Sequence, residues 1–226
     1  MQRSSKVLAL VVGLAAAGLV GLVGVLAWRI VDARDKTPAL IARVVSRADP
    51  DIRALSAERV QEYLTVEDPT FWTNDGVDLD TPGAGQTTTT QGLGKLIYFK
   101  RFRKGYWNKL QLILMSKYAL TPKTSKRDIF TSALALTPMG ELNGRGITGF
   151  AQASQAYFGR RLRDVSNDQF LTLVAMQLGP AQYDPVVNAR ASAERVSRIK
   201  RLLSGVCRPT NLDDVTLEGC AQPASP

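Results

Sequence analysis

The sequence predicts a mainly α-helical domain behind one N-terminal transmembrane helix, and three observations support this prediction. The segment from Val7 to Trp28 contains 22 residues and no charge. Apolar residues then recur at helical spacing from Ser56 nearly to the C-terminus, whereas the alternating pattern of a half-buried strand is scarce. A chain of 226 residues is large enough for one hydrophobic core and short for two.

The uncharged segment has the length of a membrane-spanning helix. At about 1.5 Å per residue, it would cross a hydrocarbon core of about 30 Å. A secretory signal has an apolar stretch of only about 7 to 15 residues and a small-residue cleavage site, so we expect an uncleaved anchor. Because basic residues flank the segment on both sides, the short N-terminal tail is what favours a domain outside the cytoplasm.

Four parts follow one another along the chain. Residues 1–35 are expected to form the N-terminal tail and anchor, and residues 36–55 a charged connector. Residues 56–205 are expected to form the domain, and residues 206–226 a C-terminal tail. No internal repeat divides this domain.

The helices of the domain are predicted from their caps and apolar faces. Ser56 can cap a helix that runs directly into Glu67 and Asp68. The glycine- and threonine-rich stretch from Val77 to Gly94 is expected to be a loop. Further helices are expected over Leu110–Tyr118, Ile129–Leu134, Ile147–Phe158, Phe170–Leu178 behind a capping box of Ser166 and Gln169, and about Ala189–Ser204.

Histidine and cysteine counts limit the chemistry. The chain has no histidine, which excludes imidazole-based triads, histidine-ligated zinc and histidine general bases. Its two cysteines, Cys207 and Cys220, are too few for a zinc site and enough for one disulfide, which would suit an oxidising exterior. An acid or base must therefore be a carboxylate, a lysine or a tyrosine, and no metal site is predicted.

One block of the chain carries more than the whole net charge of +9. Between Thr81 and Arg127 the sequence has ten basic residues and no acidic one, with aromatic residues interleaved. Such a block is typical of nucleic-acid binding and also of a membrane interface that contains anionic lipid. The anchor favours the membrane, so the predicted partner is membrane lipid and not nucleic acid.

The segment Gly85–Lys95 combines glycines, hydroxyls and a lysine, as a nucleotide-binding P-loop does. It fails the P-loop pattern, because one required glycine is missing and Leu96 replaces the metal-binding hydroxyl. It remains a polar segment able to offer backbone N–H groups, hydroxyls and one ammonium group to an oxyanion.

Four segments of the chain follow one another at characteristic distances: 66–78, 85–95, 157–160 and 179–185. In order and spacing they resemble the motifs of family 51 peptidoglycan glycosyltransferases. The Glu-Asp, Phe and Gly of Val66–Asp78 are similar to the first motif, and Gly85–Lys95 is similar to Gly-Gly-Ser-Thr-Ile-Thr-Gln-Gln with its following lysine. Tyr157–Arg160 and Gly179–Pro185 are similar to the later Tyr-Phe-Gly-Lys and Pro-Ser-x-Tyr-Asn-Pro segments. The resemblance covers about residues 61–204 and implies a lysozyme-like glycosyltransferase domain.

The resemblance also implies the site residues. Glu67 would be the catalytic general base, and the neighbouring Asp68 would raise its pKa or brace the loop. A divalent cation as cofactor is left open. The implied residues for binding the substrate diphosphate are Thr88, Thr90, Gln91, Lys95 and Lys109, and the implied supporting residues are Asp68, Phe71, Asn74 and Gly76.

The sequence departs from the family pattern at several positions. Asn74 stands where the family has a histidine, and Gln86 and Gly92 replace a glycine and a glutamine. The third motif, Arg-Lys-x-x-Glu, falls at Asn108–Leu112, and no carboxylate occurs anywhere between residues 80 and 128. The connection between the first two motifs is also short.

From these features we expect a peptidoglycan glycosyltransferase that polymerises lipid II by an inverting transfer. Its place would be the bacterial inner membrane, with the domain outside the cytoplasm. Its partners would be lipid II, the nascent glycan strand, membrane lipid and other cell-wall synthesis proteins. The sequence as given leaves no room for a transpeptidase domain, so cross-linking is not expected.

Two other functions are weighed against this one. The absent third-motif glutamate motivates a catalytically degenerate homologue that binds lipid-linked precursor or glycan and regulates a partner synthase. A glycan-cleaving enzyme with Glu67 as general acid is the other alternative, but it does not explain the diphosphate-binding lysines.

Overall fold

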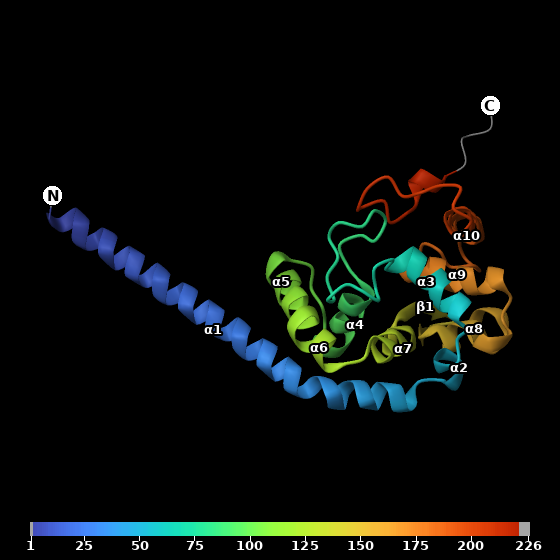
Figure 1. Ribbon diagram of the computed structural model, residues 1–226, viewed down its shortest axis with the longest axis horizontal. Coiled ribbons are helices and arrows are strands. Elements are labelled where there is room, and N and C mark those ends of the chain that lie inside the picture. The colour runs from blue at the N-terminus through green and yellow to red at the C-terminus, as the bar shows by residue number, and fades with distance from the viewer. Residues whose placement is uncertain (1, 222–226) are drawn as a thin grey trace.

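The computed structural model describes residues 2–221, with side chains at residue 7 and from residue 9 onward. It confirms a mainly helical protein with one long N-terminal apolar helix (Figure 1). The elements in chain order are α1 (Gln2–Arg47), α2 (Pro50–Arg53), α3 (Ala57–Glu67), α4 (Thr89–Tyr98), α5 (Tyr106–Met115), the π-helix η1 (Ser116–Leu120), α6 (Thr121–Lys123), α7 (Lys126–Leu136), β1 (Pro138–Leu142), β2 (Arg145–Thr148), α8 (Phe150–Phe158), the 3-10 helix η2 (Leu162–Asp164), α9 (Asn167–Leu178), α10 (Ala189–Leu203) and the 3-10 helix η3 (Glu218–Cys220).

An aromatic cluster forms the centre of the domain and joins α3, α7, α8 and α9. The ring of Tyr63 packs edge-on against Phe130 and Phe150, with centroids 5.3 and 5.8 Å apart. Phe150 in turn lies 6.2 Å from Phe170, and all four side chains are buried. Because Tyr63 is one helical turn before Glu67, this core determines where the end of α3 lies.

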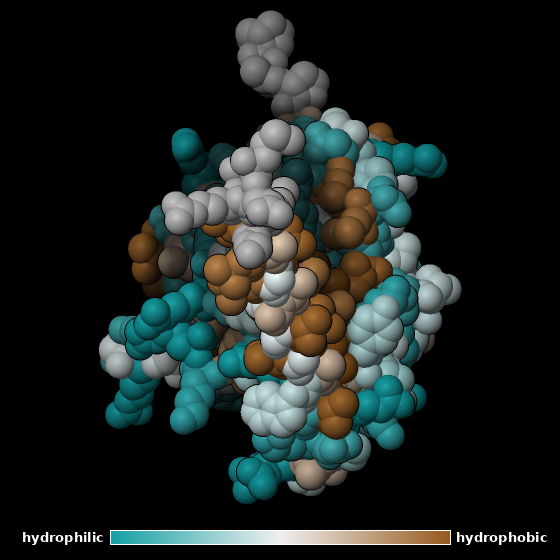
Figure 2. Space-filling model, turned by 90° about the vertical axis from the view of Figure 1, so that its left-hand side faces the viewer, coloured by the Kyte–Doolittle hydropathy of each residue, from teal (hydrophilic) through white to brown (hydrophobic). Residues whose placement is uncertain are grey.

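Helix α1 is long enough and apolar enough to cross a membrane. Its N-terminal part projects away from the domain in Figure 1, and Figure 2, which looks toward that end, shows apolar side chains gathered along it. Pro38 lies inside the helix and removes one backbone hydrogen bond, which accounts for the change of direction before the last turns. The side chains of Arg3 and Lys6, which bear on the predicted orientation, lie outside the described side chains.

The C-terminal part of α1 is packed against the domain. Ala33, Thr37 and Ile41 are buried, and the Thr37 hydroxyl lies within hydrogen-bond distance of the Tyr98 hydroxyl. Arg29 donates to the side-chain oxygen of Gln111 on α5. The segment 36–55, expected as a connector, therefore continues α1 to Arg47 and adds the short helix α2.

The expectation of a loop from Val77 to Gly94 is wrong for its last residues, because α4 begins at Thr89. Thr88 caps this helix by accepting a hydrogen bond from the backbone N–H of Gln91 at 3.1 Å. A Cβ at Gly94 would lie only 3.0 Å from Leu112. Glycine at this position therefore allows α4 to pack closely against α5. Threonine and glycine lower helix propensity, but capping and close packing outweigh that preference here.

Other local predictions are confirmed. Ser56 caps α3, and Ser166 with Gln169 forms the capping box of α9.

The antiparallel hairpin β1–β2 was not expected, and it includes Ile147, which the sequence pattern had assigned to a helix. Its two strands are too short to display a clear alternating pattern.

The predicted disulfide joins Cys207 and Cys220. It closes residues 207–220 into what we call the stapled loop. Figure 1 shows this loop, in red, beside the green-blue segment that precedes α4. Its side chains Leu217 and Cys220 are buried in the main core. The segment expected as a C-terminal tail is therefore part of the domain up to residue 221.

Candidate functional site

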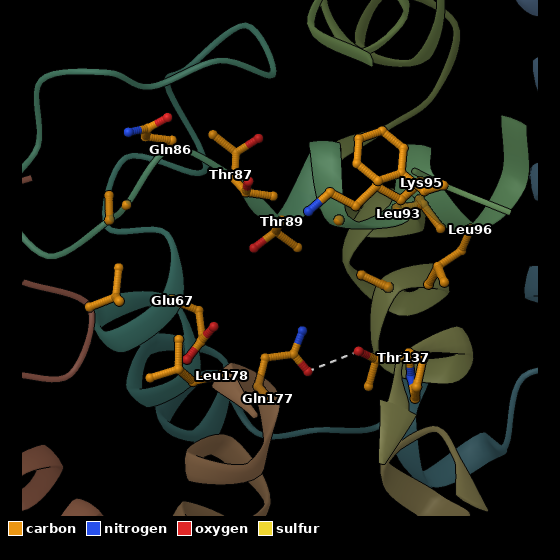
Figure 3. Close-up of a pocket in the computed structure, with 18 of the residues that line it drawn as sticks. Glu67, Gln86, Thr87, Thr89, Leu93, Lys95, Leu96, Thr137, Gln177 and Leu178 are labelled. Carbon is orange, nitrogen blue, oxygen red and sulfur yellow. Dashed lines mark hydrogen bonds between the residues drawn. The ribbon is translucent and has the colours of Figure 1, made fainter. Parts of the chain in front are cut away.

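A cavity of about 690 Å³ lies at the end of α3, between that helix, α4 and the segment preceding α4 (Figure 3). It is open to solvent, and both polar and apolar side chains line it. The polar residues that line it are Tyr63, Glu67, Gln86, Thr87, Thr88, Thr89, Lys95, Lys100, Arg101, Thr137, Gln177 and Arg195.

Glu67 is the last residue of α3, and its carboxylate points into the cavity (Figure 3). Burial raises the pKa of Glu67 to about 7, while Arg195 lowers it and Asp68 raises it further. Asp68 therefore contributes to the shift as expected, but burial is the larger cause. A carboxylate with a pKa near 7 is suited to accept a proton at neutral pH.

Asp68 braces the site from behind. Its buried carboxylate accepts hydrogen bonds from the side chain of Asn74 and from the backbone N–H of Thr89, both at 2.8 Å. Because Thr89 is the first residue of α4, this carboxylate ties the end of α3 to the start of α4. The bracing role is the one that the hydrogen bonds support.

Asn74 organises the turn that follows α3. Its side-chain oxygen accepts from the backbone N–H of Gly76 at 3.0 Å and from the ammonium group of Lys126 at 3.1 Å. That ammonium group also lies 4.7 Å above the buried ring of Phe71. Gly76 has a φ of +94°, and a Cβ there would lie 2.6 Å from Thr121, so a larger residue does not fit. Asn74, Phe71 and Gly76 thus support the site without lining the cavity.

Residues 87–91, which we call the threonine segment, include side chains that line the cavity and side chains that are buried away from it. Thr88 uses its hydroxyl to cap α4 and to donate to the backbone oxygen of Gly76 at 2.8 Å. Thr90 and Gln91 are fully buried and do not line the cavity. Thr87, Thr88 and Thr89 do line it, and the Thr89 hydroxyl is buried without a hydrogen-bond partner.

The two lysines of the predicted diphosphate site occupy different positions. Lys95 lines the cavity, and burial, followed by the charge of Lys104, lowers its pKa. Lys109 lies behind the threonine segment, where its ammonium group donates to the backbone oxygen of Gln86 and to Gln91 Oε1, the latter at 2.8 Å. Burial, followed by the charge of Lys95, lowers the pKa of Lys109 to about 8.

Leu112, which the motif resemblance predicts to stand at the position of the third-motif glutamate, is an apolar side chain of the core. Leu112 is fully buried, so it presents nothing to the cavity. The side chain of the preceding Gln111 points toward α1, where it accepts from Arg29 at 2.5 Å; it also donates to the backbone oxygen of Trp107 within α5. Residues 108–112 therefore provide no carboxylate to Lys95 and the other cationic side chains that line the cavity.

Several cavity residues were not predicted from the sequence. Arg195 is buried on α10, and its Nε and Nη1 atoms have no hydrogen-bond partner. An arginine on the buried face of an amphipathic helix was the signal that could have identified it. Thr137 and Gln177 line the wall opposite α4 and are joined by a hydrogen bond of 3.0 Å (Figure 3). Lys100 and Arg101 were noted only as members of the basic block.

A divalent cation would find few protein ligands here. Residues 2–221 contain no group of three or more Asp, Glu, His or Cys side chains placed to hold a metal ion. Glu67 is the carboxylate that lines the cavity. Mg²⁺ commonly keeps several waters and binds one or two carboxylates together with substrate phosphates. A cation in this cavity would thus depend on substrate oxygens.

Comparison with known proteins matches residues 37–204 to the Transglycosylase family. Penicillin-binding protein 1B of Vibrio cholerae is 32% identical over 157 residues, which are 64% of this chain and 20% of that protein. A candidate transglycosylase of Cupriavidus necator is 27% identical over 190 residues, 77% of this chain and 80% of that protein. Penicillin-binding protein 2a of Streptococcus pneumoniae is 28% identical over 210 residues, 82% of this chain and 28% of that protein. The family match begins in the docked part of α1 and ends before the stapled loop.

Proposed function

This chain belongs to the transglycosylase family, and we propose that it polymerises lipid II into glycan strands on the outer face of the cytoplasmic membrane. The observation that carries the proposal is the placing of Glu67. It is a carboxylate with a pKa near 7 in a cavity that also contains unpaired donors and cations. Glycosyl transfer from a diphosphate-linked donor needs both a proton acceptor for the attacking hydroxyl and a site for the departing diphosphate.

In the proposed transfer, Glu67 accepts the proton of the acceptor sugar hydroxyl as that oxygen attacks the anomeric carbon of the donor. The bond from this carbon to the diphosphate oxygen breaks, and the diphosphate leaves with the electron pair. Attack on the face opposite the leaving group inverts the configuration. Lys95, Lys100 and Arg101 line the cavity and would neutralise the leaving diphosphate. The free hydroxyl of Thr89 would donate to a substrate oxygen.

Lys109 would contribute to diphosphate binding mainly through the threonine segment. Its ammonium group contacts the backbone oxygen of Gln86 and lies 3.3 Å from the Thr87 hydroxyl, and both of these residues line the cavity. It therefore adds positive charge close to the anion while holding the segment in place. Thr88, Thr90 and Gln91 would act in the same way, by holding the start of α4.

A second function is supported by one observation, the buried Leu112 at the third-motif position. A chain that lacks this carboxylate would serve as a binding module for lipid-linked precursor and regulate a partner synthase. Purified full-length protein with labelled lipid II separates the two functions. Glycan polymer would support the transferase, whereas saturable binding without polymer would support the binding module.

The pH dependence of kcat/KM is expected to be bell-shaped. The rate should rise through about pH 7 as Glu67 loses its proton, and fall above about pH 8 as Lys109 loses its charge. The measurement is initial rates of polymerisation from pH 5.5 to 9.5 at low substrate concentration. In Lys109→Arg the cation persists at high pH, so the falling limb should move to higher pH and the rising limb should remain.

A pH dependence of kcat/KM in the opposite direction would contradict the role of Glu67 as general base. A rate that falls as pH rises through about 7 would mean that Glu67 works in its protonated form, as a general acid. That result would favour the glycan-cleaving alternative.

Removal of residues 1–28 is expected to leave a folded domain that polymerises bilayer-embedded lipid II at least about tenfold more slowly. The anchor confines the enzyme to the surface that holds the substrate, which raises its effective concentration there. The deletion stops before Arg29, because this side chain bonds to Gln111. Rates on vesicles should be compared with rates on detergent-dispersed substrate, where the deficit should shrink. Equal rates of both proteins on vesicles would contradict the role of the anchor.

A further inference from the structure

The stapled loop lies directly against the segment that leads into α4. The backbone N–H groups of Gly83 and Gly85 donate to the carbonyl oxygens of Asn211 and Leu212, each at 2.9 Å. Both glycines have positive φ angles, +80° and +65°. A Cβ on Gly85 would lie 2.6 Å from Val215, so the two segments are in close contact. The segment 83–85 therefore takes its conformation from the stapled loop as well as from its own sequence.

The stapled loop is itself well ordered. The Asp214 carboxylate accepts from the backbone N–H groups of Thr210, Glu218 and Gly219, at 2.9, 2.6 and 3.0 Å. Its ends are joined by the disulfide, and Leu217 and Cys220 are buried in the core. Arg198 of α10 also donates to the backbone oxygen of Thr216. These contacts make the loop a rigid support for whatever lies on it.

The contact continues into the candidate site. Val215 of the stapled loop lines the cavity together with Glu67. Gln86 follows Gly85 directly; its side chain lies 3.4 Å from Asp213, and its backbone oxygen accepts from Lys109. The stapled loop thus reaches the residues around the proposed diphosphate position through segment 83–87.

We propose that the stapled loop is a positioning element of the site, which holds residues 83–87 ready for a diphosphate-linked donor. The identity of that ligand rests on the proposed function. Segment 83–87 begins with two glycines in three residues, so ordering it only on binding would cost conformational entropy. A preformed segment lowers that cost and strengthens binding. The stapled loop lies outside the residues matched to the family, which end at residue 204.

Hydrogen exchange tests the proposal without any assay of activity. The full-length protein in detergent micelles is compared in its oxidised form and after reduction with a phosphine. Exchange of the amides in residues 83–87 is expected to rise about tenfold or more, because the hydrogen bonds to Asn211 and Leu212 loosen. Amides of α9 should not change. Equal protection of residues 83–87 in the two forms would overturn the proposal.

Two variants separate positioning from general loss of stability. Cys207→Ser with Cys220→Ser removes the disulfide, and Asp214→Asn weakens the loop while keeping the disulfide. The control is Asp51→Asn, which breaks contacts with Arg161 and Arg163 away from this loop. Both loop variants should raise KM for lipid II by about tenfold with less than about a threefold change in kcat, because ground-state binding is what they weaken.

The outcomes of the variant experiment are distinct. An equal rise of KM in Asp51→Asn, at a matched melting temperature, would show general destabilisation and overturn the proposal. Unchanged KM in variants whose residues 83–87 exchange faster would also overturn it. If the unaltered protein makes no polymer, the proposed transferase function fails by itself. The positioning role is then decided by the exchange rates and by titration with inorganic pyrophosphate, whose binding should weaken in both loop variants.

Discussion

Glu67→Gln is expected to abolish polymer formation while preserving the binding of lipid II. Glutamine keeps the shape of the side chain and removes its ability to accept a proton. Loss of a general base typically lowers the rate by about 100-fold to 10,000-fold. Polymer should be measured by gel separation of the products from labelled lipid II, and binding by titration of the same substrate.

Glu62→Gln is the matched control for this experiment. Glu62 lies on the same helix and its pKa is also raised by burial, but it does not line the cavity. This variant should polymerise at close to the unaltered rate. Because even the smallest typical effect is about 100-fold, a Glu67→Gln protein that retains more than about a third of the activity would eliminate Glu67 as the base. Under the binding-module function neither variant would change turnover, since there would be none to lose.

Lys95→Ala is expected to weaken substrate binding as well as turnover. Its ammonium group lines the cavity, so its loss would leave diphosphate charge unpaired. A hydrogen bond to a charged group contributes about 1.5 to 3 kcal/mol, which corresponds to about a 10-fold to 150-fold rise in Kd. Titration of the full-length protein with lipid II at fixed salt measures this change.

Lys123→Ala provides the matched control for charge. Lys123 is an exposed lysine of α6 in the same basic block, and it does not line the cavity. Its removal should change Kd by less than about twofold, since exposed charges are screened by salt. An equal rise of Kd in both variants would show that the basic block as a whole attracts the anion and that Lys95 does not bind the diphosphate directly. Unlike Glu67→Gln, Lys95→Ala should weaken binding under both proposed functions.

Local patterns predicted the helices well because each pattern reports the helix itself. Ser56 and Ser166 were identified as caps from the residue types that begin a helix, and both accept the expected backbone hydrogen bond. The same reasoning failed at Thr89–Gly94, where threonine and glycine suggested a loop. There the helix is stabilised by the Asp68 carboxylate, which bonds to the first residue of α4 from a distant part of the chain. Propensity does not report such a contact.

The site shows the same division between local and distant information. Glu67 and Lys95 were named from motifs, and both line the cavity. Thr90 and Gln91 were named from the same motifs but are buried away from it, whereas Thr89 faces it. Which side of a helix turns toward a cavity depends on the register in which that helix packs. A string of neighbouring polar residues does not specify this register.

By itself, the sequence determined the long apolar N-terminal helix, the helical class, the pairing of its two cysteines and the residue types available for chemistry. These features follow from composition, from hydrophobic period and from motifs within short stretches of chain. The tertiary structure decided that Arg195 and the stapled loop, both near the C-terminus, meet Glu67 and the threonine segment across one cavity. The reason is physical: burial and distant contacts set the pKa of Glu67 and the conformation of residues 83–87, and both arise only when separate helices pack around a common core.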